Sequence, residues 1–131
     1  MSDTKYGYAG GILVINLADE SYEIVDSAPY VDEWIGGHGL CSKLFWDYCE
    51  DKTVEAVDPG NVLVFAATPF SGAVVPAASA RCEFTGISPF SLPEWYNRSS
   101  MGGRLAGMMK EAGYDAAWCA GKRKRPCGSA W

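Results

Sequence analysis

The stretch from residue 81 to residue 115 constrains the fold of this chain more than any other part of the sequence. Behind a glycine pair, Gly102 and Gly103, apolar residues recur with the spacing of one helical face. These residues are Leu105, Met108, Met109 and Ala112. Gly113 follows at a position where a helix end favours a left-handed backbone. The pattern predicts a short amphipathic helix over residues 104–112, whose methionines we expect to fill the core rather than bind a ligand.

One basic side chain, Arg81, stands at the head of this stretch, and the glycine pair lies at its centre. Backbone N–H groups at a helix start lack intrahelical acceptors and carry the positive end of the helix dipole. A residue without Cβ also lets a ligand approach the backbone closely. Arg81, Gly102 and Gly103 therefore suggest a site for an anion such as phosphate. The same residues also fit a surface arginine and a loop that caps a helix, so this alternative stays open.

The rest of the chain predicts an α+β fold with mainly antiparallel sheets. Strands are expected where β-branched or unbroken apolar runs occur, at residues 11–17, 22–25, 62–67, 79–85 and 116–120. Helices are expected over residues 28–35 and 40–48, in addition to the one after the glycine pair. The segment 89–101 is predicted to be a polar loop, because Pro89 breaks the preceding strand and Pro93 prevents an early helix.

A second glycine pair, Gly36 and Gly37, also precedes an amphipathic helix. Both helices are preceded by predicted strands and followed by another strand. The sequence thus suggests two pseudo-repeated strand–strand–helix–strand units.

Length and charge limit the class of protein. A chain of 131 residues is one domain's worth, so residues 1–131 are expected to form a single domain. Residues 1–80 carry twelve acidic and three basic side chains, whereas residues 81–131 carry four and eight. Half of these eight lie at residues 122–125, too few to predict nucleic-acid binding in an acidic chain. Apolar runs are far shorter than the ~20 residues of a membrane span, and a cytoplasmic protein is expected.

Cysteine and histidine usage argues against a metal centre within this chain. The five cysteines are Cys41, Cys49, Cys82, Cys119 and Cys127. They form no C-x-x-C pair, so we expect buried thiols rather than disulfides, zinc or an iron–sulfur cluster. His38 is the only histidine and is interpreted as a turn residue. Asp115 is interpreted as the cap of a turn rather than a base.

A series of short motifs, in order and spacing, covers nearly the whole chain. They lie at residues 8–17, 35–40, 58–59, 61–67, 69–72, 81, 88–89, 102–103, 112–115, 121–122 and 126. Taken together, this series resembles the N-terminal domain of the aldehyde ferredoxin oxidoreductases, the tungsten-pterin enzymes.

The resemblance implies a saddle of β-sheets on which a bis-pterin cofactor lies and holds tungsten or, more rarely, molybdenum. It implies that Arg81 pairs with the anionic portion of the pterin. The backbone of Ser100, Met101, Gly102 and Gly103 would wrap the cofactor near its phosphates. The implied chemistry is the oxidation of an aldehyde to a carboxylic acid, with electrons passing through an iron–sulfur cluster to ferredoxin or another electron carrier.

Three departures from the family pattern bear on this expectation. His38 stands where many relatives have arginine, and Ser100 stands where they have asparagine. The loop after Pro89 is longer than in relatives, which makes Asn97 a displaced substitute for that asparagine.

The cluster cysteines and the substrate pocket of the family belong to later domains that this sequence lacks. We therefore expect a fragment or truncated product whose partner is the rest of the oxidoreductase polypeptide. A homodimer is also compatible with the resemblance, whereas a nucleic-acid or membrane partner is not expected. The alternative is a non-catalytic binding or partner module that kept the fold and lost the cofactor.

Overall fold

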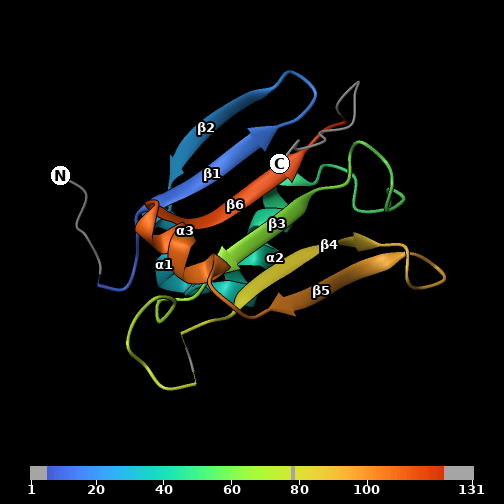
Figure 1. Ribbon diagram of the computed structural model, residues 1–131. Coiled ribbons are helices and arrows are strands. Elements are labelled where there is room, and N and C mark those ends of the chain that lie inside the picture. The colour runs from blue at the N-terminus through green and yellow to red at the C-terminus, as the bar shows by residue number, and fades with distance from the viewer. Residues whose placement is uncertain (1–5, 78, 123–131) are drawn as a thin grey trace, which may run out of the picture.

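The computed structural model describes residues 6–77 and 79–122, and it places helices on both faces of one β-sheet (Figure 1). The elements in chain order are β1 (Gly11–Asn16), β2 (Ser21–Asp26), α1 (Ala28–Trp34), α2 (Gly37–Tyr48), β3 (Leu63–Ala67), β4 (Cys82–Ser88), β5 (Trp95–Met101), α3 (Leu105–Glu111) and β6 (Tyr114–Ala120). No helix in this part of the chain is long and apolar enough to cross a membrane.

The sheet has the strand order β2-β1-β6-β3-β4-β5. Four of its neighbouring pairs are antiparallel, and only β1 and β6 run parallel. The predicted α+β class with mainly antiparallel pairing is therefore confirmed. The strands form one continuous open sheet within the described residues.

The expected internal echo is visible in the order of the elements. β1, β2, α1, α2 and β3 are followed by β4, β5, α3 and β6. In the sheet, the last strand of each set lies beside the first strand of the other set. Replacing every strand by its counterpart in the other set therefore gives the same strand order, counted from the opposite edge of the sheet. The strand directions break this symmetry, since β1 is parallel to β6 whereas β4 is antiparallel to β3.

The larger part of the core lies between α2 and the sheet. Leu40, Leu44 and Phe45 of α2 are buried against Ile12, Val64 and other strand residues, as their helical spacing predicts. A smaller cluster under α3 contains Ala67, Cys82, Ala106 and Met109. Met109 is buried as expected, but the expectation for Met108 is wrong because its side chain is 61% exposed.

One strand was missed by the sequence interpretation. Residues 95–101 form β5, which pairs antiparallel with β4 along its whole length. The strand lies at the edge of the sheet, and every side chain except that of Tyr96 is exposed. Because an edge strand with polar side chains on both faces shows no apolar alternation, its sequence reads as a loop.

The start of α2 also differs from expectation. The helix begins at Gly37, so His38 lies in its first turn and not in a loop before it. Any residue with a Cβ atom at position 39 would place that atom 2.6 Å from the carbonyl oxygen of Trp34. Gly39 is therefore needed to let α1 and α2 follow each other closely.

The prediction that Asp115 caps a turn is wrong. Its carboxylate is 2% exposed and accepts hydrogen bonds from the backbone N–H groups of Ala9 and Gly10, at 2.9 and 2.8 Å. The Ser27 hydroxyl donates to it at 2.6 Å, and Lys110 of α3 forms an ion pair with it. The carboxylate joins the entry to β1, the start of α1, α3 and β6.

We expect Asp115→Asn to lower the free energy of unfolding by about 3 kcal/mol, since removing one partner of a buried ion pair leaves the other uncompensated. Burial by itself raises the pKa of Asp115, but the hydrogen bonds from Lys110, Ser27, Ala9 and Gly10 outweigh it and hold the pKa below its ordinary value of 3.8. The stabilisation should therefore be complete above that value and disappear as pH falls through the lowered pKa.

Urea unfolding of both proteins across acidic pH measures this contribution. The matched control is Asp47→Asn, which removes an exposed pair with Lys43 on α2 and should change stability little. A difference between wild type and Asp115→Asn that stays constant from neutral to strongly acidic pH would contradict the assigned linkage.

Candidate functional site

The β4–β5 hairpin brings together two of the predicted site residues. Arg81 immediately precedes β4, and its Nη1 atom donates a hydrogen bond to the Ser100 Oγ of β5 at 3.2 Å. Ser100 lies opposite Glu83 in the antiparallel register. A contact between residues 19 positions apart in the chain is thus a direct product of hairpin pairing.

These residues border a hollow of about 360 Å³ on the outer edge of the sheet. Its lining residues are Arg81, Glu83, Arg98, Ser99 and Ser100. The sequence interpretation overlooked Arg98. It would have been found if residues 95–101 had been recognised as a strand, because Arg98 and Ser100 are two positions apart and share a face.

The direction of that face is fixed by an aromatic contact. The ring of Tyr96 packs on Phe45 of α2, with 4.9 Å between ring centroids. Alternation along the strand then places Arg98 and Ser100 on the α2 side of β5 as well. The hollow therefore opens beside α2 and away from α3.

Two other predicted residues lie on the opposite face of β5. Asn97 is opposite Gly86, and its Oδ1 accepts a hydrogen bond from the backbone N–H of Arg98 at 2.7 Å. Met101 is opposite Cys82, whose side chain belongs to the cluster under α3. Asn97 thus does not share a face with Ser100.

Gly102 and Gly103 lie between β5 and α3 and do not line the hollow. A Cβ built on either one meets no atom within 4 Å, so this backbone is open to an approaching ligand. Gly103 has φ of +102°, a left-handed conformation that larger side chains rarely adopt. The pair therefore forms a bare stretch of main chain next to the strand that carries Ser100.

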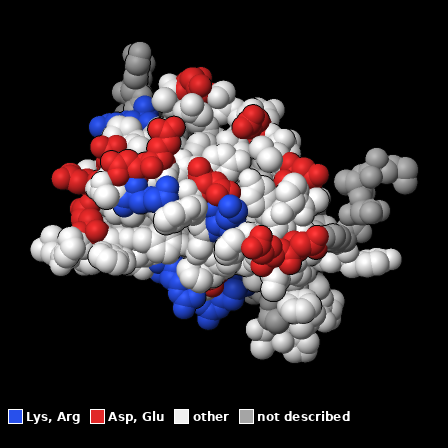
Figure 2. Space-filling view, turned by 180° about the vertical axis from the view of Figure 1, so that it is seen from behind, with Lys and Arg blue, Asp and Glu red and all other residues white. Residues whose placement is uncertain are grey.

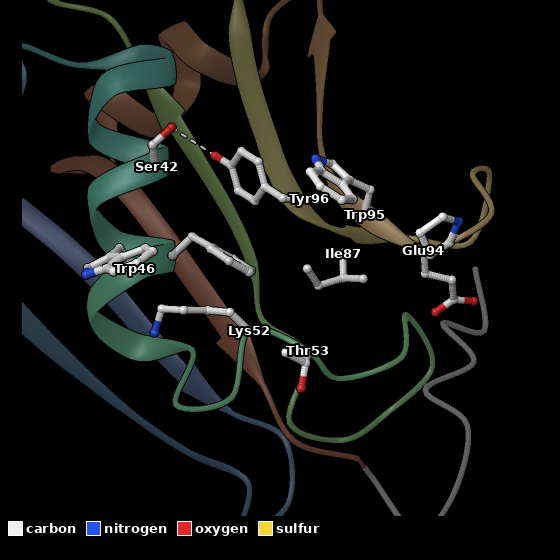
Figure 3. Close-up of a pocket in the computed structure, with 10 residues that line it drawn as sticks. Ser42, Trp46, Lys52, Thr53, Ile87, Glu94, Trp95 and Tyr96 are labelled. Atoms are coloured by element: carbon white, nitrogen blue, oxygen red, sulfur yellow. Dashed lines mark hydrogen bonds between the residues drawn. The ribbon is translucent and has the colours of Figure 1, made fainter.

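A larger aromatic pocket of about 620 Å³ lies elsewhere, between α2, the loop after it and the start of β5 (Figure 3). Trp46, Trp95 and Tyr96 face this space, and the Ser42 and Tyr96 hydroxyls are 2.9 Å apart. Its charged groups already have partners. Lys52 stacks over Trp46 and donates to a backbone carbonyl, and Glu94 accepts from a backbone N–H. None of the predicted site residues lies there.

The described residues contain no group of three or more histidine, cysteine or acidic side chains that could hold a metal ion. Burial raises the pKa of the Cys41 thiol to about 12 and that of Cys82 to about 11, with nearby Cys82 or Glu83 adding to the shift. Cys49 is also buried, Cys119 is partly buried, and all four thiols are free. The prediction of buried thiols is thus confirmed for Cys41, Cys49 and Cys82, and Cys127 lies outside the described residues.

The sequence and the fold match known proteins. A family model described as the N-terminal domain of aldehyde ferredoxin oxidoreductase matches residues 12–129. The tungsten-containing aldehyde ferredoxin oxidoreductases of Pyrococcus furiosus and Pyrococcus abyssi are 27% and 28% identical to the chain over 122 residues, or 92% of its length. The solved active site complex BamBC of benzoyl coenzyme A reductase, in complex with 1,5-dienoyl-CoA, contains a similar chain, with a TM-score of 0.83 and 31% identity over 93% of this chain.

These matches define the class as a cofactor-binding domain of oxidoreductases. More specifically, the chain belongs to the aldehyde ferredoxin oxidoreductase N-terminal domain family, as the ordered motifs predicted. The chain spans about one fifth of the length of the curated relatives, 20% and 19%, and 18% of the chain in the solved complex.

The residues present fit an anionic cofactor of this family. The ion pairs within residues 6–77 and 79–122 involve neither Arg81 nor Arg98, so both guanidinium groups remain available to a ligand. The open backbone at Gly102 and Gly103 offers N–H groups without a side chain in the way. Both features lie on or beside β5.

The thiol environments give a test of the structure at this site. We expect Cys41, Cys49 and Cys82 to react with DTNB only after unfolding, because burial disfavours their thiolate forms. Mass spectrometry after labelling of the native chain identifies the modified positions. Rapid native labelling of Cys82 would contradict the packing of β4 under α3, while complete labelling in denaturant serves as the control.

Proposed function

We propose that this chain is the tungstopterin-binding domain of an oxidoreductase that converts aldehydes to carboxylic acids. The observation that carries the proposal is the pairing of Arg81 with Ser100 at an open hollow, directly before the bare main chain of Gly102 and Gly103. The tungsten-containing relatives support the choice of metal, with molybdenum as the alternative.

Each residue has a defined part in this proposal. The planar guanidinium of Arg81 can present two parallel N–H groups to an anionic oxygen pair of the pterin. Ser100 holds that guanidinium in place through its hydroxyl. The backbone of Met101, Gly102 and Gly103 offers contacts near the cofactor phosphates.

The cofactor, when bound, supplies the two-electron oxidation of the substrate, and the protein binds and orients it. Electrons would leave through an iron–sulfur cluster to ferredoxin or another carrier. That cluster and the substrate pocket belong to other parts of the parent polypeptide in this proposal.

A non-catalytic module is the second candidate. Ser100 stands in place of the family's asparagine, and Asn97 lies on the other face of β5, where it cannot substitute for that side chain directly. A chain that kept the fold and lost the cofactor would tolerate both changes. Cofactor content separates the two candidates.

The direct test is the tungsten and pterin content of the parent protein, purified from a host that makes the cofactor and is supplied with tungstate or molybdate. We expect metal and pterin in a fixed ratio to the polypeptide. Protein that is folded but contains neither would favour the non-catalytic module.

We expect Arg81→Ala to lower the affinity for the cofactor about tenfold or more, because charge-assisted hydrogen bonds are among the strongest polar contacts. Stability should hardly change, since an exposed arginine contributes little to folding. Pterin per folded polypeptide and the midpoint of thermal unfolding measure the two effects separately. If the variant unfolds more easily but keeps its pterin content per folded molecule, Arg81 has a structural role and does not bind the cofactor.

Gly102→Ala tests the backbone contact in the same way. A Cβ at this position meets no neighbouring atom, so the fold should be unaffected. We expect pterin content to fall if the main chain approaches the cofactor closely. Gly39→Ala is the contrasting variant, because its Cβ clashes with the Trp34 carbonyl and should lower stability instead. Unchanged pterin content in Gly102→Ala would argue against close approach at this residue.

A further inference from the structure

We propose that Arg98 acts together with Arg81 as a two-arginine clamp for a phosphate or diphosphate group. This inference rests on the proposed function, since it adds a second side chain to the same anion site. Nothing in the family resemblance points to residue 98. Residue 98 is indicated instead by the register of β5 and by the residues that line the hollow.

The hairpin fixes the position of both arginines. In the pairing of β4 with β5, Ser100 lies opposite Glu83 and Arg98 lies opposite Thr85. Arg98 is therefore one strand repeat away from the serine that receives the Arg81 hydrogen bond, on the same face. Both arginines line the same hollow of about 360 Å³.

Neither arginine forms an ion pair with the part of the chain that the structure describes. Both are exposed. Seen from the α2 side, basic side chains gather at the lower edge of the molecule, where β4 and β5 lie (Figure 2). Arg81 bonds only a neutral hydroxyl within this part of the chain, so its charge is free for a ligand.

The composition of the hollow selects the kind of anion. Glu83 also lines it, so two positive charges and one negative charge meet there. A monoanion would gain little from a net charge of one in an exposed setting. A phosphate or diphosphate carries more charge and several acceptor oxygens, and it can engage two guanidinium forks and the Ser100 hydroxyl together.

Two sources can supply this group. One is the phosphate portion of the pterin cofactor, and the other is a phosphorylated substrate such as a coenzyme A thioester. Both share the same oxygen chemistry at the clamp. The variants below distinguish them.

Binding of inorganic pyrophosphate to the 131-residue chain tests the clamp without any cofactor. NMR titration at low ionic strength, where screening is weak, should give saturable shifts at β4 and β5. We expect Arg98→Gln to weaken the affinity about tenfold, Arg81→Gln to weaken it at least as much, and Arg98→Lys to have an intermediate effect. Arg104→Gln removes an exposed arginine that does not line the hollow, and it should change the affinity less than about twofold.

Thermal unfolding of each variant confirms that the fold is kept, so that lost binding is not lost structure. A wild-type chain without pyrophosphate affinity at low ionic strength overturns the proposal. So does an Arg98→Gln variant that binds as tightly as wild type, or an Arg104→Gln variant that loses as much affinity as Arg98→Gln.

Pterin content of the parent protein then separates this inference from the proposed function. If wild type lacks pterin but Arg98→Gln loses pyrophosphate affinity, the clamp stands and the cofactor proposal fails. If wild type contains pterin and Arg98→Gln keeps both pterin and pyrophosphate affinity, the clamp fails and the cofactor proposal survives. If Arg98→Gln loses affinity for pyrophosphate and for coenzyme A yet keeps its pterin, the clamp holds a phosphorylated substrate.

Discussion

The buried carboxylate of Asp115 is the interaction on which this arrangement depends. A nearly inaccessible charge is costly unless it is paired and hydrogen-bonded, and here two backbone N–H groups, Ser27 and Lys110 surround it. These partners come from segments up to 106 residues apart in the chain. One side chain thereby fixes the parallel pairing of β1 with β6 and the position of α3 against it.

The contacts of Asp115 also position the glycine pair of the candidate site, because α3 lies between them. Because Lys110 of α3 is held by Asp115, the helix has a defined position on the sheet. Gly102 and Gly103 connect that helix to β5, so their open backbone is fixed at both ends. The arginine hollow depends instead on the β4–β5 register. The two halves of the site are thus positioned by different constraints, one electrostatic and one from strand pairing.

Sequence patterns predicted the elements that bury one clear face. The stripe of Leu40, Leu44 and Phe45 and the apolar run of β3 could be read directly, because burial imposes their periodicity. β5 could not, since an edge strand with both faces exposed leaves no such pattern. Arg98 was overlooked for the same reason. Asp115 was misinterpreted because its partners are distant in sequence, and local spacing contains no information about them.

The separation of the two halves of the site limits what can occupy both. The hollow lies on the α2 side of β5, and the bare main chain begins two residues after Ser100, at the end of the strand. Two residues of extended chain span roughly 7 Å. One phosphate and the hydrogen bonds that its oxygens accept cover a similar length, so it contacts both places only when it lies between them. A larger phosphorylated ligand can keep its anionic group at the arginines while a second part lies against Gly102 and Gly103.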